Sequence, residues 1–271
     1  MENNENVKLF YSTDFNEDER AGRETLEYAR SKEIISRYLC EGLMDIADIC
    51  GATGAYAFWL AEMGHRVHLL DLAEKHIEIA RQKSAKNGIK LISYSCADAR
   101  CLPYENESMD MVLLMGALYH FRSKEARIKC LSEAFRVLRK GGTLICTVMN
   151  RYNYLISSMK YGHLERLGIE PIKQALSTGV FDNTSYTRLP LSYGHTPQEI
   201  VGEMTEAGFG EIRQVAVEGL ANAMSNNTLP ANKEEAAQLM QGIALVESVP
   251  ELIGVSRNII SVGIKTGDMT P

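Results

Sequence analysis

Residues Ile46 to Leu72 read IADICGATGAYAFWLAEMGHRVHLLDL, and this stretch decides the fold. A short apolar run ends in the turn Cys50–Gly54, and the residues after it place apolar side chains on one face of a helix. Gly64 suits the end of that helix because glycine readily adopts a positive φ. A second apolar run then closes on Asp71. The pattern predicts a parallel β-α-β unit with a glycine-containing first turn.

The turn and Asp71 together favour a nucleoside ligand. A turn that contains glycine lets a ligand approach the backbone, and an acid that closes the second strand accepts hydrogen bonds from ribose hydroxyls. The dinucleotide fingerprint G-x-G-x-x-G does not occur in this turn. A nucleotide-dependent oxidoreductase on a related sheet is therefore a minor alternative.

The turn, read from Asp48 as D-I-C-G-A-T-G, resembles motif I of the class I S-adenosylmethionine-dependent methyltransferases, D-x-G-x-G-x-G. Asp48 and Gly54 fall on the motif. Cys50 and Ala52 stand where its first two glycines are expected, and Gly51 occupies a variable position. The closest resemblance is to the small-molecule enzymes that share the ubiquinone-biosynthesis type of core.

Two later segments support this resemblance. In CADARCLPY, residues 96–104, an acid is followed by Leu-Pro, and in the resembled class that acid meets the adenine amino group. A carboxylate suits the role because it only accepts hydrogen bonds. The continuous apolar run Met111–Met115 suits a central parallel strand buried on both faces. The resemblance places the methionine portion of the ligand just past the end of this strand.

The resemblance implies S-adenosylmethionine as cofactor, with S-adenosylhomocysteine as product. Asp71 is expected to hold the ribose, Asp98 with the backbone of Ala99 the adenine, and the glycine turn the methionine end. The full set of expected cofactor-binding residues is Asp48, Cys50, Gly51, Ala52, Gly54, Asp71, Leu72, Asp98, Ala99, Met115 and Gly116.

Acceptor-side candidates come from three further segments. His120 is a candidate base because imidazole titrates near neutral pH, and Tyr11 is a second catalytic candidate. In proteins that resemble this one the N-terminal segment packs over the cofactor, which also brings Arg30 toward the ligand. The expected substrate-binding residues are Tyr119, His120, Arg188, Tyr193 and His195. The alternative for each is structural: an aromatic anchor, a surface cation, or a histidine that holds a loop.

The order of elements predicts an α/β fold: a Rossmann-like, doubly wound, mostly parallel seven-stranded sheet, with helices on both faces and an antiparallel C-terminal edge strand. We expect one methyltransferase domain over residues 1–271. Its expected parts are an N-terminal arm and helix acting as a lid (1–44), a cofactor-binding core (45–148), a substrate-cap insertion (149–195), and a C-terminal part that completes the sheet (196–271).

Composition sets the class of protein and its compartment. The 271 residues are 45% hydrophobic and 24% charged, with a net charge of −6, as in an ordinary globular protein. No long basic run favours nucleic acid, no apolar run is long enough to span a bilayer, and the N-terminus does not read as a signal peptide. The six cysteines form no C-x-x-C pair, which indicates reduced thiols and a cytoplasmic protein. No metal site is expected, and the sequence gives no indication of the oligomeric state.

These expectations predict a methyltransferase that transfers the methyl group to an O, N or S atom of a small-molecule acceptor by in-line displacement. Two alternatives stay open. One is a methyltransferase that acts on RNA or protein, although no N-P-P-Y-type tetrapeptide is present. The other is a degenerate fold that binds the cofactor without transferase activity. Cys50 and Ala52 support this alternative because they replace two glycines of the motif.

Overall fold

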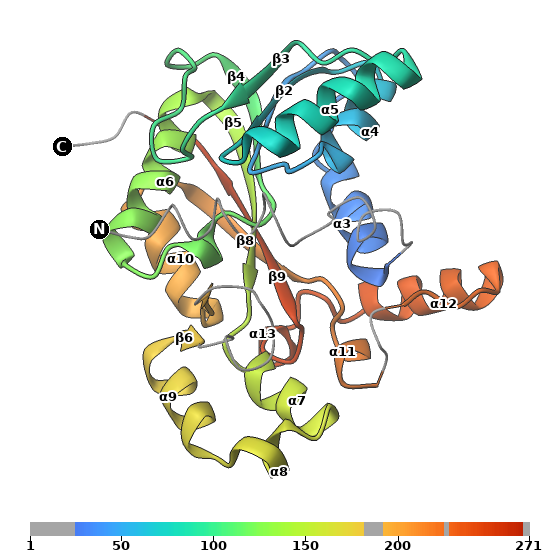
Figure 1. Cartoon of the computed structure of the whole chain (residues 1–271), viewed down its shortest axis with the longest axis vertical. Helices are drawn as coiled ribbons and strands as arrows, with labels where there is room; N and C mark the ends of the chain where they lie inside the picture. The colour runs from blue at the N-terminus through green and yellow to red at the C-terminus, as the bar shows by residue number, and fades with distance from the viewer. Residues whose placement is uncertain (1–24, 182–191, 225–227, 268–271) are drawn as a thin grey trace.

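A computed structural model describes residues 25–181, 192–224 and 228–267, and its centre is a seven-stranded sheet of order β3-β2-β1-β4-β5-β9-β8 (Figure 1). The strands are β1 (Asp45–Ile49), β2 (Arg66–Asp71), β3 (Ser93–Cys96), β4 (Met109–Leu114), β5 (Leu138–Met149), β8 (Gly210–Ala216) and β9 (Asn258–Ile264). The first five pair in parallel, whereas β9 runs antiparallel to both of its neighbours. The predicted fold class is confirmed, with the antiparallel strand lying one position inside the edge that β8 forms.

Helices cover both faces of this sheet (Figure 1). One face carries α3 (Leu26–Ser36), α4 (Ala55–Glu62) and α5 (Glu74–Asn87), and the other carries α6 (Lys124–Val137) and α10 (Pro197–Glu206). Alternate residues of β4 belong to two separate apolar clusters: Met111 and Leu113 to one, Val112 and Leu114 to the other. A parallel strand with both faces buried reads as the continuous apolar run seen in the sequence.

Two helices differ in detail from their sequence pattern. The apolar periodicity of residues 124–140 predicts a helix that reaches Lys140, but α6 ends at Val137 and Arg139 lies in β5. There Arg139 pairs with Asp110 near the start of β4 and with Asp45 at the start of β1. Two carboxylates, and not the dipole of a helix C-terminus, therefore stabilise its charge. The spacing of Tyr56, Trp59, Leu60 and Met63 predicts the buried face of α4. In the structure that face is formed by Ala57 and Leu60, and Met63 is 51% exposed.

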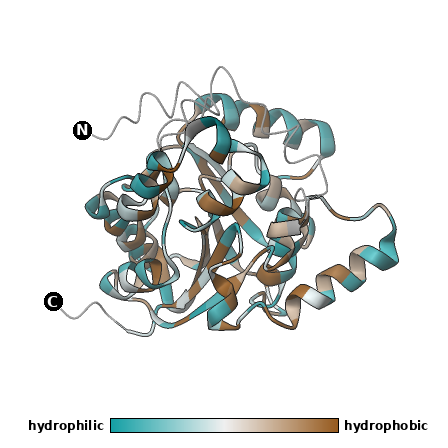
Figure 2. Cartoon of the chain, turned by 90° about the horizontal axis from the view of Figure 1, so that it is seen from below, coloured by the Kyte–Doolittle hydropathy of each residue, from teal (hydrophilic) through white to brown (hydrophobic). Residues whose placement is uncertain are grey.

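The chain between β5 and α10 leaves the sheet and forms a small helical unit below it in Figure 1. Its elements are α7 (Asn153–Lys160), α8 (His163–Leu167), α9 (Glu170–Thr178) and the antiparallel pair β6 (Val180–Phe181) and β7 (Ser192–Tyr193). A second departure from the sheet is the connection between β8 and β9, where the spacing of Leu239, Ile243 and Val246 predicts one helix. That connection contains α11 (Ala221–Met224), α12 (Lys233–Ala244) and α13 (Pro250–Ile253). In Figure 2, α12 projects from the body with both polar and apolar residues along it.

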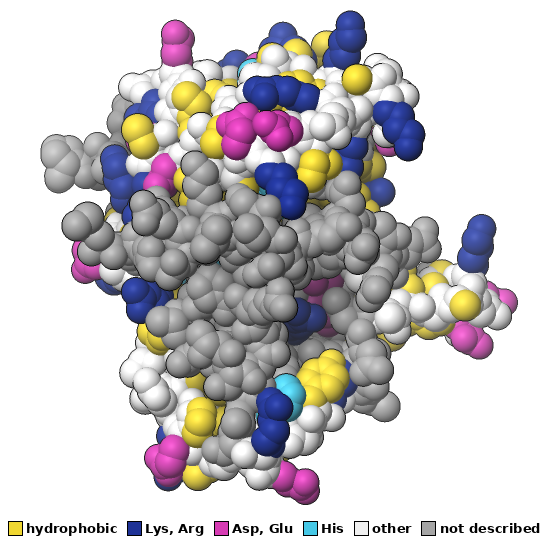
Figure 3. Space-filling model, viewed as in Figure 1, with side chains coloured by type: hydrophobic (Ala, Val, Ile, Leu, Met, Phe, Trp, Pro, Cys, Tyr) yellow, Lys and Arg dark blue, Asp and Glu magenta, His cyan; other side chains and the backbone are white. Residues whose placement is uncertain are grey.

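Over the described surface seen in Figure 3, acidic and basic side chains are interspersed among apolar ones. Across the ranges that the structure describes, no helix combines the length and the apolar character that crossing a membrane requires.

Candidate functional site

The turn after β1 has the backbone conformation that its sequence motif requires. Cys50 and Ala52 have φ values of 56° and 49°, and Gly54 has 87°. This left-handed region strongly favours glycine, which explains why the resembled motif carries glycines at these positions. Gly51 is needed for a different reason, because a Cβ there would lie 2.5 Å from Oδ2 of Asp48 and 2.6 Å from Cδ1 of Leu69. The position that the motif treats as variable is thus sterically restricted in this chain.

Asp48 lies under this turn and is fully buried. Its Oδ2 accepts a hydrogen bond of 3.1 Å from the backbone nitrogen of Ala57 and so ties β1 to the first turn of α4. Burial raises the pKa of the Asp48 carboxyl to about 7, and the charge of Asp71 adds to the effect. The position therefore supports the turn from below, and direct contact with a ligand stays a prediction.

Asp71 is the last residue of β2, and its carboxylate is held from two sides. Oδ2 accepts a hydrogen bond of 2.9 Å from the nitrogen of Ala52, in the turn after β1. Oδ1 accepts one of 2.8 Å from the nitrogen of Ala73 and lies 3.1 Å from Nδ1 of His76. The expected ribose acid and the expected methionine turn are therefore bonded directly to one another. Leu72 follows, and its carbonyl lies 3.4 Å from the Cys96 thiol.

The expected adenine acid, Asp98, forms a bidentate pair with the guanidinium of Arg100, at 2.6 Å between Nη2 and Oδ2 and 3.0 Å between Nε and Oδ1. Its Oδ1 also accepts the backbone nitrogen of Arg100 at 2.9 Å. Ala99 beside it is buried. The sequence did not indicate Arg100 as a partner of Asp98. An adenine amino group that bonds Asp98 would share the carboxylate with Arg100.

The segment after β4 carries the next group of expected residues. Met115 accepts a contact of 3.4 Å from the Thr147 hydroxyl, and a Cβ on Gly116 would lie 3.2 Å from the Tyr119 hydroxyl. Tyr119 and His120 lie in the short 3₁₀ helix η1 (Leu118–His120), with their ring centroids 4.3 Å apart. Burial lowers the pKa of His120 to about 4, against the opposing effect of the Asp71 charge. His120 is therefore neutral at pH 7.

The segments after β1 and at the end of β2 meet directly, through the hydrogen bond from the nitrogen of Ala52 to Oδ2 of Asp71. Burial raises the pKa of the Cys50 thiol well above its usual value, and the charges of Asp71, Asp98 and Asp48 raise it further. The charge of Asp71 likewise acts on His120, whose pKa it raises. Since β1, β2 and β4 are parallel neighbours, the residues at their carboxyl ends form one region at one edge of the sheet.

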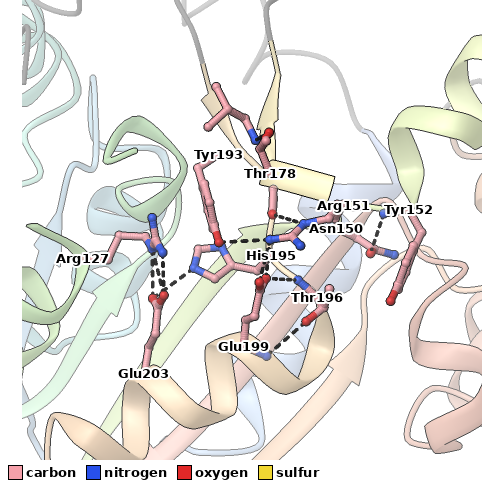
Figure 4. A network of polar contacts seen from close by, with 12 residues as sticks. Arg127, Asn150, Arg151, Tyr152, Thr178, Tyr193, His195, Thr196, Glu199 and Glu203 are labelled. Atoms are coloured by element: carbon pink, nitrogen blue, oxygen red, sulfur yellow. Dashed lines mark hydrogen bonds and ion pairs between the residues drawn. The ribbon is translucent and has the colours of Figure 1, made fainter. Parts of the chain in front are cut away.

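Tyr193 and His195, expected on the substrate side, belong to a buried ionic network (Figure 4). His195 is fully buried, with Nε2 3.2 Å from Oε2 of Glu203, and burial lowers its pKa although that carboxylate is adjacent. The Tyr193 hydroxyl accepts a hydrogen bond of 3.0 Å from Arg151, which also pairs with Glu199 at 2.6 Å. A substrate role for Tyr193 and His195 stays a prediction.

Arg127 is the centre of this network and was not found from the sequence. Its guanidinium bonds Glu203 at 2.6 Å, and both side chains are buried. Nη1 donates to the carbonyls of Phe121 and Arg122 at 3.0 and 2.8 Å, directly after η1. Arg127 and Glu203 are 76 residues apart in the sequence, and no local pattern announces such a pair.

The remaining expected residues lie elsewhere. Tyr11 and Arg188 fall outside the described residues. Arg30, expected to face the ligand, is fully buried and is bonded instead to Glu33, to Glu247 and to the carbonyl of Val217. Across the described ranges, no three His, Cys, Asp or Glu side chains form a group that could hold a metal ion.

Comparison with known proteins finds a family match for the central part of the chain. Residues 47–146 match the family described as a methyltransferase domain. Demethylmenaquinone methyltransferase of Lactococcus lactis is 34% identical over 106 residues, which are 38% of this chain and 41% of that protein. Ubiquinone/menaquinone biosynthesis C-methyltransferase UbiE of Brucella canis is 27% identical over 169 residues, 61% of either chain. This chain thus spans less than two thirds of the length of either relative.

A solved structure shows the same fold. The S-adenosylmethionine-dependent methyltransferase of Methanosarcina mazei aligns with a TM-score of 0.59 at 19% identity, over 87% of this chain and 98% of its own. The chain therefore carries a methyltransferase domain at residues 47–146 and has the fold of the class I S-adenosylmethionine-dependent methyltransferases.

Proposed function

We propose that this chain binds S-adenosylmethionine at the carboxyl ends of β1, β2 and β4 and transfers its methyl group to a small-molecule acceptor. The observation that carries the proposal is the hydrogen bond of 2.9 Å from the nitrogen of Ala52 to Oδ2 of Asp71. It joins the turn that would face the methionine portion to the acid that would face the ribose. In open α/β sheets, ligands bind beyond the carboxyl ends of the strands.

The residues present fit this cofactor. A carboxylate offers about four acceptor sites, and Asp71 uses three of them within the described residues, which leaves one for a ribose hydroxyl. Cys50 and Ala52 keep the left-handed conformation of the motif although neither is glycine. Both residues therefore adopt a backbone conformation in which glycine would carry no steric penalty.

Each element has a defined task in the proposed reaction. Bound S-adenosylmethionine would supply an electrophilic methyl group on sulfur. Asp71 would hold the ribose, Asp98 and Ala99 the adenine, and the Gly51–Gly54 turn with Met115 and Gly116 the methionine end. Because the leaving group is already good, the chain mainly has to align the acceptor in line and exclude water.

For the acceptor we propose an O, N or S atom of a small molecule, with Tyr119, His120, Tyr193 and His195, and Tyr11 and Arg188 outside the described residues, as its contacts. A pKa of about 4 makes His120 a weak base at neutral pH. That value suits an amine, whose nitrogen attacks through its own lone pair, or a thiol, which ionises more readily than an alcohol. The helical insertion is consistent with a cap over the acceptor, and its return strand β7 packs against η1.

A carbon acceptor is a second candidate. It is favoured by one observation: the UbiE protein of Brucella canis is named as a C-methyltransferase.

We also propose a cytoplasmic location, because all six cysteines are free thiols. RNA or protein acceptors and a fold that binds without turnover remain outcomes of the test below.

The test begins with calorimetric titration of the purified chain with S-adenosylmethionine, S-adenosylhomocysteine and NAD. We expect binding of both adenosyl ligands and none of NAD. Asp71→Asn should weaken the binding about tenfold or more, because it removes a charged acceptor. Asp110→Asn is the matched control, since Asp110 lies at the other end of β4 and pairs with Arg139.

Transfer is then measured with S-adenosylmethionine labelled in its methyl group, in pools of small alcohols, amines, thiols and phenols, and separately with RNA and with protein. Label in RNA or protein would replace the small-molecule proposal. Binding without label in any pool would favour a binding fold, and the absence of adenosyl binding would overturn the proposal.

A further inference from the structure

We infer that His76 is a positioning residue that sets the orientation of the Asp71 carboxylate toward the ribose. The inference rests on the proposed function, since it assigns a role in binding the same cofactor. It concerns a side chain that no sequence motif marks.

The contact is short and almost sealed from solvent. Nδ1 of His76 lies 3.1 Å from Oδ1 of Asp71, and the two residues are 3% and 7% exposed. An ionised carboxylate only accepts hydrogen bonds, so the proton of this contact lies on Nδ1. His76 therefore donates to the carboxylate oxygen that points away from the Ala52 turn.

The local backbone explains why a donor is needed there. Helix α5 follows Ala73, whose methyl group cannot cap the free N–H groups of the first turn. Asp71 takes over part of this task, because its Oδ1 accepts the nitrogen of Ala73 at 2.8 Å. The other oxygen of the same carboxylate, Oδ2, accepts a hydrogen bond from the nitrogen of Ala52 in the turn after β1.

His76 is the third residue of α5, and its side chain reaches back toward the start of the helix, as the Glu or Gln of a capping box does. With Ala52, Ala73 and His76 as donors, the carboxylate is held from both ends. Its plane and its remaining acceptor site are therefore fixed before a ligand arrives. Removing one donor allows the group to rotate, and part of the binding energy must then restore its orientation.

A purely structural role for His76 would also lower stability when it is lost, so the test uses coupling with Asp71. Asparagine places an amide nitrogen where Nδ1 lies in histidine, whereas leucine has a similar shape and no donor. S-adenosylhomocysteine is titrated calorimetrically into the full chain as wild type, His76→Leu, His76→Asn, Asp71→Asn and the double variant Asp71→Asn/His76→Leu.

We expect His76→Leu to weaken the binding about tenfold and His76→Asn to stay within about twofold of wild type, because a hydrogen bond to a charged group is at stake. In the Asp71→Asn background, His76→Leu should have almost no further effect. His68→Leu is the matched control, because His68 lies in β2, as Asp71 does, but its Nδ1 contacts Ser93 at 3.0 Å and not Asp71. Its affinity should equal that of wild type.

Wild-type affinity in His76→Leu, or an equal loss in both backgrounds, would overturn the inference and leave the proposed function intact. Absence of binding in the wild type would overturn both. If the leucine variant does not fold, His76→Gln replaces it, since its amide lies one bond beyond the Nδ1 position and is expected to lose the contact.

Discussion

The guanidinium of Arg127 lies 3.6 Å from the centroid of the Tyr193 ring and is bonded to both carboxylate oxygens of Glu203. Arg127 belongs to α6, Tyr193 to β7 and Glu203 to α10. One side chain therefore joins the return strand of the insertion to the helices that cover one face of the sheet. Its bonds to the carbonyls of Phe121 and Arg122 extend this link to the segment that carries His120.

Replacing Arg127 with methionine is expected to lower the free energy of unfolding by about 3–5 kcal/mol, because Glu203 would be left buried without its cation. Urea denaturation followed by circular dichroism measures this change. Lys124→Met is the control on the same helix, since Lys124 and its partner Glu206 are 54% and 53% exposed. The control should leave the midpoint nearly unchanged. Similar losses in the two variants would contradict the assignment.

Two substitutions in the β1 turn are expected to have opposite signs. Ala52→Gly relieves a residue with φ of 49° and should raise the free energy of unfolding by up to about 1 kcal/mol. Gly51→Ala adds a methyl group 2.5 Å from Oδ2 of Asp48 and should lower it by about 1–3 kcal/mol. Equilibrium unfolding of both variants, side by side, checks the prediction. It is wrong if both changes have the same sign.

The buried Asp48 carboxyl makes stability depend on pH. Its pKa is raised from 3.8 to about 7, so between these values the folded protein holds a proton that the unfolded chain has released. The free energy of unfolding is therefore expected to fall as pH rises through this window.

Asp48→Asn does not titrate at this position and removes that dependence. Near pH 4 the variant and the wild type should have similar free energies of unfolding. As pH rises to about 8, the free energy of unfolding of the variant should come to exceed that of wild type by on the order of 2–4 kcal/mol. Denaturation of the ligand-free protein across this range is the measurement. A difference that does not change with pH would show that Asp48 is ionised throughout.

The capping box of α10 offers a local test. The Thr196 hydroxyl accepts the nitrogen of Glu199, and the Glu199 side chain accepts the nitrogen of Thr196. Thr196→Ala should lower the free energy of unfolding by about 1 kcal/mol. Thr205→Ala removes an exposed hydroxyl from the last turn of the same helix and should change it much less. Thermal unfolding of the two variants compares them directly, and equal effects would argue against the cap.

Those features that short-range physics determines could be predicted from the sequence. The β-α-β unit with Asp71 at its end follows from periodicity and from one turn, and the start of α10 follows from Thr-Pro-x-Glu. The doubly wound, mostly parallel sheet follows from the alternation of strands and helices, because crossover connections admit few arrangements.

The features that were missed depend on residues far apart in the chain. Arg139 reads as the last turn of a helix until Asp45 and Asp110 are placed beside it. Arg127 has no visible role without Glu203 and Tyr193, and Arg30 has none without Glu247. His76 lies only five residues from Asp71, but the contact requires the bend between β2 and α5, which its neighbours do not specify.

The position of β9 governs the order in which the sheet can be completed during synthesis. The strand that comes last in sequence lies between β5 and β8, so β8 has no partner in the sheet until residues 258–264 have left the ribosome. Such late pairing between distant segments is slow to form. Until then β5 exposes a long unpaired edge, a surface on which nascent chains associate with one another. A chain that stops before β9 would therefore lose two strands of the sheet, although only one had been removed.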